Sequence, residues 1–178
     1  MNEKVCVYLE LPDYLAQWYA YQCREHHFVD DDICPIDPYR ALTPVDPIKG
    51  SQECLILKRF LKKQPTAIPE PIPEKANLAI AIPYFQERDP RVYNYLGPHA
   101  KAKLGKTIAE SFRICLWDEI HQFAAWTRRQ DETIFCFMEN HGIACNETNW
   151  NAIAKVYQRM RNVYNVQKSR KKRSISRR

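Results

Sequence analysis

The chain has only four glycines among its 178 residues, and they stand far apart, at positions 50, 97, 105 and 142. The phosphate-binding loops of P-loop and Rossmann nucleotide sites need several glycines close together, so the sequence excludes both classes of site. No run of about 18 apolar residues occurs, which predicts that no segment spans a membrane. Residues 1–11 combine charged residues with a short apolar stretch and lack the features of a secretory signal peptide.

Carboxylates are missing from the C-terminal part of the sequence. Residues 148–178 contain ten Lys or Arg and no Asp or Glu, whereas residues 1–50 contain four Lys or Arg and nine Asp or Glu. The formal net charge of +6 therefore originates in the C-terminal stretch. Ordinary solvated surfaces mix charges of both signs. The segregation indicates a polyanionic partner, most often nucleic acid, with a solubilising tail as the alternative.

Proline is absent after Pro98, although the chain holds twelve prolines. The first half must therefore be interrupted by turns and extended segments, while the second half can form long helices. Hydrophobic residues make up 45% of the chain, which is enough for a core. We expect a mostly α fold (α+β by strict count) with two short strands, a C-terminal three-helix unit and a disordered basic tail.

The composition also divides the chain into parts. The expected parts are a small α+β region (1–64), a proline-rich connector (65–77), a helical domain (78–166) and a basic tail (167–178).

Two short strands are expected in the first half. Apolar residues alternate with others over residues 5–11, which predicts a strand with one buried face. Residues 78–82 form a continuous apolar run, which suits a strand buried on both faces. We expect the two strands to pair, because isolated strands are unstable.

Helices are expected between these strands and throughout the second half. The first half predicts one helix from Pro12 to about Cys23 and another from the N-cap Ser51 to about Lys63. Pro98 opens a third helix, whose apolar residues recur every three or four positions. They are Leu104, Ile108, Phe112, Cys115, Leu116, Ile120 and Phe123.

A fourth helix is expected to start at a capping box and to stop at a glycine. Thr127 and Gln130 form the capping box, and Gly142 can take the left-handed position that ends the helix. Its expected apolar face consists of Ile134, Phe135, Phe137 and Met138.

The last helix is expected to begin near Thr148 or Asn149 and to have two distinct faces. Its apolar residues, which should dock on the other helices, are Trp150, Ile153, Tyr157, Met160 and Tyr164. The opposite face carries Lys155, Gln158, Arg159 and Asn162. We predict that this face binds nucleic acid together with the basic tail, because such side chains contact phosphates and base edges. The tail residues concerned are Lys168, Arg170, Lys171, Lys172 and Arg173.

This pair of helices resembles a helix-turn-helix DNA-binding unit. Residues 128–141 correspond to the supporting helix and residues 149–166 to the recognition helix, although the connection, 142–148, is longer than the usual tight turn. The stretch that runs from Asp89–Leu96 to Asn149–Lys155 looks like small uncharacterised proteins of bacterial mobile elements and prophages. That resemblance implies a biological context and no particular activity.

One cluster has the composition of a metal site. It consists of Cys23, His26, His27 and Cys34, of which Cys-x-x-His is half of a zinc-binding pattern. Because the second half of the pattern lacks a ligand, we interpret the cluster as adventitious and expect neither metal nor cofactor.

Catalytic patterns are poorly represented. Cys136 and His141 are five residues apart, which does not place them on one helix face. His99, His121 and His141 are scattered singly, and the pair Asp118–Glu119 is typical of cap or surface charges. The seven cysteines have an odd count and irregular spacing, which favours reduced thiols and a cytoplasmic protein. We expect no enzymatic activity.

The sequence therefore predicts a DNA-binding protein, with RNA as the other nucleic-acid candidate. The hypothesis from another class is a protein-interaction module whose contact surface is the acidic, proline-rich first half. The target sequence and the oligomeric state are not specified by these patterns.

Overall fold

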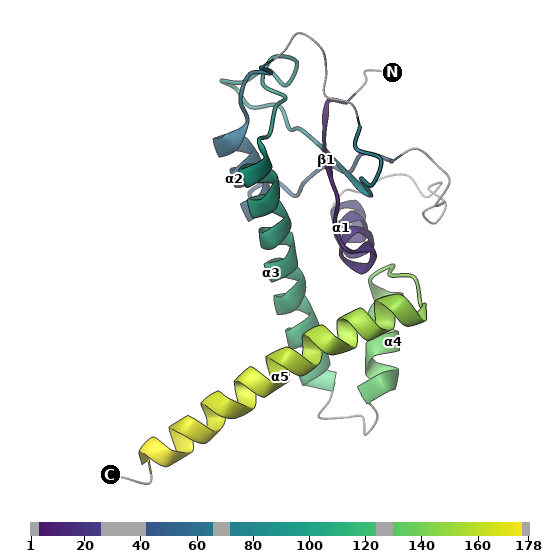
Figure 1. Cartoon of the computed structure of the whole chain (residues 1–178), viewed down its shortest axis with the longest axis vertical. Helices are drawn as coiled ribbons and strands as arrows, with labels where there is room; N and C mark the ends of the chain where they lie inside the picture. The colour runs from purple at the N-terminus through teal and green to yellow at the C-terminus, as the bar shows by residue number, and fades with distance from the viewer. Residues whose placement is uncertain (1–3, 26–41, 66–71, 124–129, 176–178) are drawn as a thin grey trace. The chain divides into compact units, whose positions relative to one another are not determined.

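The computed structural model describes residues 4–25, 42–65, 72–123 and 130–175 (Figure 1). Within these ranges lie five helices and one two-stranded sheet, which confirms the mostly α fold with a small β part. In chain order the elements are β1 (Cys6–Leu9), α1 (Asp13–Glu25), α2 (Gln52–Phe60), β2 (Leu78–Ala81), α3 (Pro98–Phe123), α4 (Gln130–Asn140) and α5 (Glu147–Ile175). None of the described helices is both long and apolar enough to cross a lipid bilayer.

The chain separates into two compact units, Met1–Glu110 and Ser111–Arg178, so the boundary falls within α3. The sequence pattern instead suggested a connector at residues 65–77. The sheet joins segments from both sides of that stretch, because β2 pairs with β1. Residues 66–71 themselves lie outside the described part of the chain.

The sheet of the first unit is antiparallel, as expected from the two apolar segments. Cys6 lies opposite Ala81, and Leu9 lies opposite Leu78. All four residues of β2 are buried, whereas β1 alternates between half-buried and buried positions. Val45 exchanges two backbone hydrogen bonds of 2.9 Å with β2, one with Ala79 and one with Ala81. These bonds satisfy backbone polar groups on the edge of β2 that faces away from β1.

Polar side chains fix both ends of α2. The Ser51 hydroxyl accepts a hydrogen bond from the Cys54 backbone N–H at 3.2 Å, which confirms the predicted N-cap. At the other end, the Arg88 guanidinium donates to the carbonyl oxygens of Lys58 (2.6 Å) and Leu61 (3.0 Å). A positive charge is favourable there because the last carbonyls of a helix carry partial negative charge.

The core of the second unit is formed by the apolar faces of three helices. Phe112 and Phe137 meet edge to face, with ring centroids 5.9 Å apart. Other fully or almost fully buried apolar residues of these helices include Leu116, Ile120, Ile134, Met138, Ile153 and Tyr157. The prediction for Phe135 was wrong: the residue is 43% exposed, because the buried face of α4 follows positions 134, 137, 138 and 141.

The connection between α4 and α5 is closed by hydrogen bonds at both helix ends. Gly142 has φ 62°, and the N–H of Ile143 donates to the Met138 carbonyl at 2.8 Å, which ends α4 as expected. The Asn149 N–H donates to the Asn146 side chain at 2.8 Å, so Asn146 caps α5. The capping box proposed at Thr127 lies outside the described residues.

Helix α5 is longer than the sequence pattern suggested. It runs without interruption to Ile175 and includes most of the tail that we expected to be disordered. The residues after Gly142 contain no proline or glycine, and Lys, Arg and Gln are good helix formers, so nothing in the sequence interrupts the helix.

Candidate functional site

The exposed face of α5 carries the four side chains predicted to bind nucleic acid. Lys155, Gln158, Arg159 and Asn162 are all exposed. On the other side of the helix, Ile153 and Tyr157 are buried. The amphipathic pattern therefore has the orientation that the sequence predicted, and binding by this face remains a prediction.

Aromatic rings hold α5 against the rest of the second unit. The Trp117 ring of α3 lies 6.0 Å from the Tyr157 ring and 5.4 Å from the Tyr164 ring, measured between centroids. Trp150, near the start of α5, stacks on Phe135 of α4 at 6.2 Å. The stacking of Trp150 on α4 agrees with the expectation that it docks on another helix, and Trp117 is a second packing anchor for α5.

Residues 161–169 of α5 are largely exposed, although the Tyr164 ring still contacts Trp117 of α3. Every residue from Arg161 to Ser169 is exposed, including Val163 at 59% and Val166 at 51%. The Lys168 ammonium lies 5.8 Å from the centroid of the Tyr164 ring. In Figure 1 the helix continues well past α4 towards the C-terminus. The predicted residues Arg170, Lys171, Lys172 and Arg173 lie within α5, and their side chains are outside the described part of the structure.

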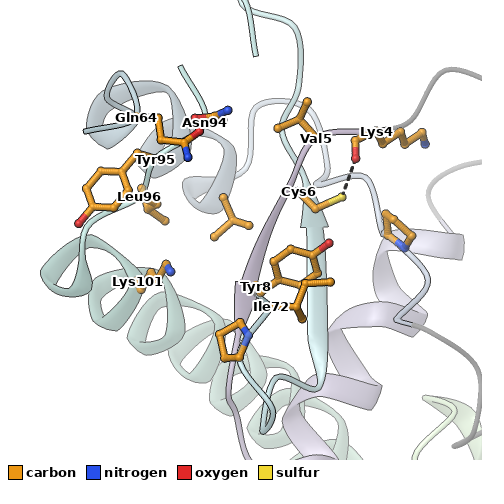
Figure 2. A pocket seen from close by; sticks show the side chains of 13 residues that line it. Lys4, Val5, Cys6, Tyr8, Gln64, Ile72, Asn94, Tyr95, Leu96 and Lys101 are labelled. Carbon is orange, nitrogen blue, oxygen red and sulfur yellow. Dashed lines mark hydrogen bonds between the residues drawn. The ribbon is translucent and has the colours of Figure 1, made fainter. Parts of the chain in front are cut away.

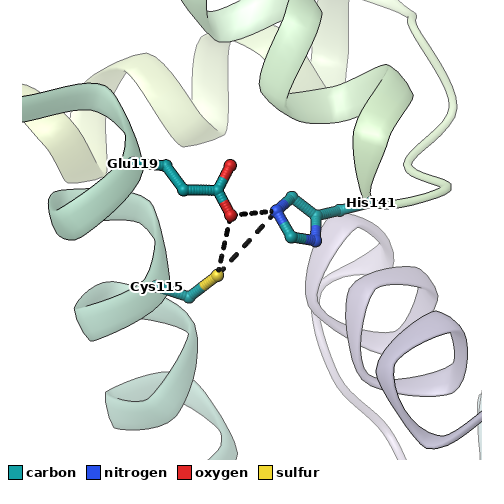
Figure 3. A network of polar contacts seen from close by, with 3 residues as sticks. All are labelled: Cys115, Glu119 and His141. Carbon is teal, nitrogen blue, oxygen red and sulfur yellow. Dashed lines mark hydrogen bonds and ion pairs between the residues drawn. The ribbon is translucent and has the colours of Figure 1, made fainter. Parts of the chain in front are cut away.

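A second arrangement of chemical interest joins α3 to the end of α4 (Figure 3). The Cys115 Sγ lies 3.6 Å from Glu119 Oε1 and 3.9 Å from His141 Nε2. The same Glu119 oxygen lies 2.6 Å from His141 Nε2. Within the described residues, this is the one group of three or more Cys, His or acidic side chains whose ligand atoms converge in this way.

Local structure positions all three side chains. Cys115 and Glu119 are four residues apart on α3 and therefore share one helix face. His141 follows the last residue of α4 and is held there by the glycine-based helix end. It is 8% exposed, with its ring 4.4 Å from the Phe137 ring between centroids.

The cluster does not have the geometry of a Cys–His–acid catalytic triad. In a triad the nucleophile and the acid contact opposite nitrogens of the imidazole. Here the thiol and the carboxylate both face Nε2 of His141. Three donor atoms that face one another across a common point are instead typical of ligands around an ion.

Sequence reasoning missed this cluster. Cys115 was assigned to the apolar stripe, Glu119 to the surface and His141 to the isolated histidines. Only pairs within one helix were compared, and the alignment of α3 with α4 is a tertiary feature that helical periodicity does not specify. The detectable signal was the Cys-x-x-x-Glu spacing on α3 together with a histidine next to a helix-ending glycine.

The N-terminal Cys/His cluster lies mostly outside the described residues, since His26, His27 and Cys34 are not among them. Cys23 is described and is 1% exposed within the first unit. Burial raises the pKa of its thiol to about 12. At neutral pH this cysteine is therefore a neutral, apolar core residue.

The first unit also contains a pocket of about 620 Å³ beside β1 (Figure 2). Its lining includes Tyr8 of β1, Ile72, and the segment from Asn94 to Leu96. Lys4, which also lines the pocket, forms an ion pair with Asp46 at 2.5 Å. The mixture of apolar and polar groups indicates no particular ligand.

Comparisons with known protein families, with curated proteins and with solved structures gave no match to this chain.

Proposed function

We propose that the protein binds nucleic acid, and duplex DNA first, through the exposed face of α5 and the basic segment that continues it. The observation that carries the proposal is the charge of one helix. From Thr148 onward the chain has ten Lys or Arg and no carboxylate, and α5 extends over most of this stretch. Because this stretch carries no carboxylate of its own, its positive charges are not cancelled by residues next to them in the sequence.

The shape of α5 suits a DNA groove. A helix of 29 residues is about 43 Å long. The major groove of B-DNA is about 12 Å wide and admits a single α-helix. Because every residue from 161 to 169 is exposed and the Tyr164 ring marks the side that contacts α3, the opposite side of this part of α5 can approach a duplex without displacing its own unit's core.

The exposed side chains divide into two roles. Lys155, Arg159 and Lys168 supply positive charge for phosphates, which gives affinity without sequence preference. Gln158 and Asn162 can form paired hydrogen bonds with adenine, which gives sequence preference. Exposed valines such as Val163 suit contacts with thymine methyl groups. The sequence resemblance implies a bacterial mobile element as the context, and a regulatory role there is part of our proposal.

A protein-interaction module is the second candidate. Apolar side chains of the first unit are exposed, with Tyr84 at 77% and Leu55 at 51%. Single exposed apolar residues are normal on protein surfaces, whereas a long basic helix without a carboxylate after Glu147 is not. We therefore place nucleic-acid binding first.

The double variant Lys155→Ala/Arg159→Ala tests the binding face. Both side chains are exposed, so the free energy of unfolding of the variant should differ from that of the wild type by no more than about 0.5 kcal/mol. If each side chain contacts one phosphate, losing both lowers the slope of log K against log salt by about 1.8, or about 0.9 per contact. If the two proteins bind equally at 1 M salt, the variant should therefore bind duplex DNA about 60-fold more weakly than the wild type at 0.1 M salt. Fluorescence anisotropy with a labelled duplex measures this loss.

The matched control is Lys58→Ala/Arg59→Ala, which removes the same charge from exposed positions of α2. It should retain most of the affinity, because α2 is not part of the proposed binding face. If net charge alone set the affinity, the two variants would lose a similar amount. If the folded α5 variant keeps full affinity for duplex DNA, single-stranded DNA and RNA, its face is not the binding surface.

A further inference from the structure

We propose that Cys115, Glu119 and His141 bind one Zn²⁺ ion. The three side chains supply a sulfur, a carboxylate oxygen and an imidazole nitrogen, which are the donor types found in zinc sites. Their ligand atoms all lie within 4.8 Å of one another, and all three residues belong to the second unit. The proposal is independent of the nucleic-acid function.

The distances between the donor atoms are close to those of a tetrahedral zinc site. With Zn–S near 2.3 Å and Zn–N and Zn–O near 2.0–2.1 Å, donor atoms of one tetrahedron lie about 3.3–3.6 Å apart. The observed distances from Cys115 Sγ are 3.6 Å to the Glu119 oxygen and 3.9 Å to the His141 nitrogen. Only the Glu119–His141 distance, 2.6 Å, must increase when an ion replaces that direct contact.

The surroundings of the cluster allow this adjustment. The Glu119 side chain is 33% exposed, so its carboxylate can move away from His141 by the fraction of an ångström that the longer distance requires. His141 is almost buried and is held by the end of α4, which provides a fixed ligand. On binding, the Cys115 thiol releases its proton to solvent as the S–Zn bond forms.

Three protein ligands leave one position of the tetrahedron for a water molecule. The Glu119 side chain is 33% exposed, so the cluster is in contact with solvent, which can supply that water. An ion bound here would link the middle of α3 to the end of α4 and so strengthen the core on which α5 packs. A ligand that binds only the folded state raises stability, so Zn²⁺ should raise the melting temperature of the protein.

Titration of the purified, metal-free full chain with Co²⁺ tests the site directly. Cobalt replaces zinc in such sites, and thiolate coordination produces a sulfur-to-cobalt charge-transfer absorption band. We expect one equivalent of Co²⁺ to produce this band and Zn²⁺ to displace it. The Cys115→Ser and Glu119→Gln variants should weaken Zn²⁺ binding by more than the roughly 10–100-fold that loss of an outer-sphere partner costs.

Two cysteine variants serve as controls. Cys136→Ser removes an exposed thiol from the same unit, and Cys34→Ser disrupts the N-terminal Cys/His cluster. Both should keep the charge-transfer band and the Zn²⁺ affinity. A wild-type protein that gives no band, or a Cys115→Ser variant that keeps it, would overturn the proposal. Loss of the band in Cys34→Ser alone would place the ion in the N-terminal cluster and equally overturn it.

Discussion

Replacing Ile153 with alanine should lower the free energy of unfolding by about 4 kcal/mol, within the usual range for a buried isoleucine. Ile153 is 0% exposed and belongs to the core that contains Leu116 and Ile134. The substitution removes apolar contacts and leaves a cavity that rigid neighbouring helices fill only partly. Urea denaturation followed by far-ultraviolet circular dichroism measures the change.

Val163→Ala is the control on the same helix. Val163 is 59% exposed, so its replacement should change the free energy of unfolding by no more than about 0.5 kcal/mol. Equal destabilisation by the two substitutions would show that α5 is not anchored through the face that contains Ile153.

Removing residues 168–178 should cause the largest loss of nucleic-acid affinity. The deletion takes away seven of the ten basic residues that follow Glu147. If three of them contact phosphates and the two proteins bind equally at 1 M salt, the truncated chain should bind duplex DNA about 500-fold more weakly than the full chain at 0.1 M salt. The factor should be similar for every DNA sequence, because phosphate contacts carry no sequence information.

A second variant separates charge from helix length. Arg170→Gln/Lys171→Gln/Lys172→Gln/Arg173→Gln removes four charges and keeps residues that favour helix. Its affinity should fall in the same direction and its salt dependence should become shallower. An unchanged affinity in both variants would mean that the end of α5 does not bind phosphates.

The elements that the sequence predicted well are those specified by local signals. The Ser51 N-cap, the Gly142 helix end and the strand pairing all follow from patterns within a few residues or from a shared need for burial. The orientation of α5 could be predicted equally well, because the helical period of 3.6 residues places Ile153 and Arg159 on different faces whatever surrounds the helix.

The features that the sequence did not predict depend on tertiary placement. Phe135 was assigned to the buried face of α4 on hydrophobicity alone, but the direction of that face is set by packing against α3 and α5. The contact between His141 and Glu119 links two helices whose relative register no local pattern specifies. The basic tail was expected to be disordered on charge alone, which neglects the helix propensity of its lysines and arginines.

The most direct test of the central claim is the affinity of the full chain for duplex DNA at 50 and 200 mM salt. If α5 and its basic extension make about six phosphate contacts, affinity should fall about 10³-fold over this interval. Single-stranded DNA and RNA, measured in parallel, identify the preferred nucleic acid. Failure to bind any of the three at 50 mM salt, or an affinity that does not depend on salt, would contradict the account and favour a protein partner instead.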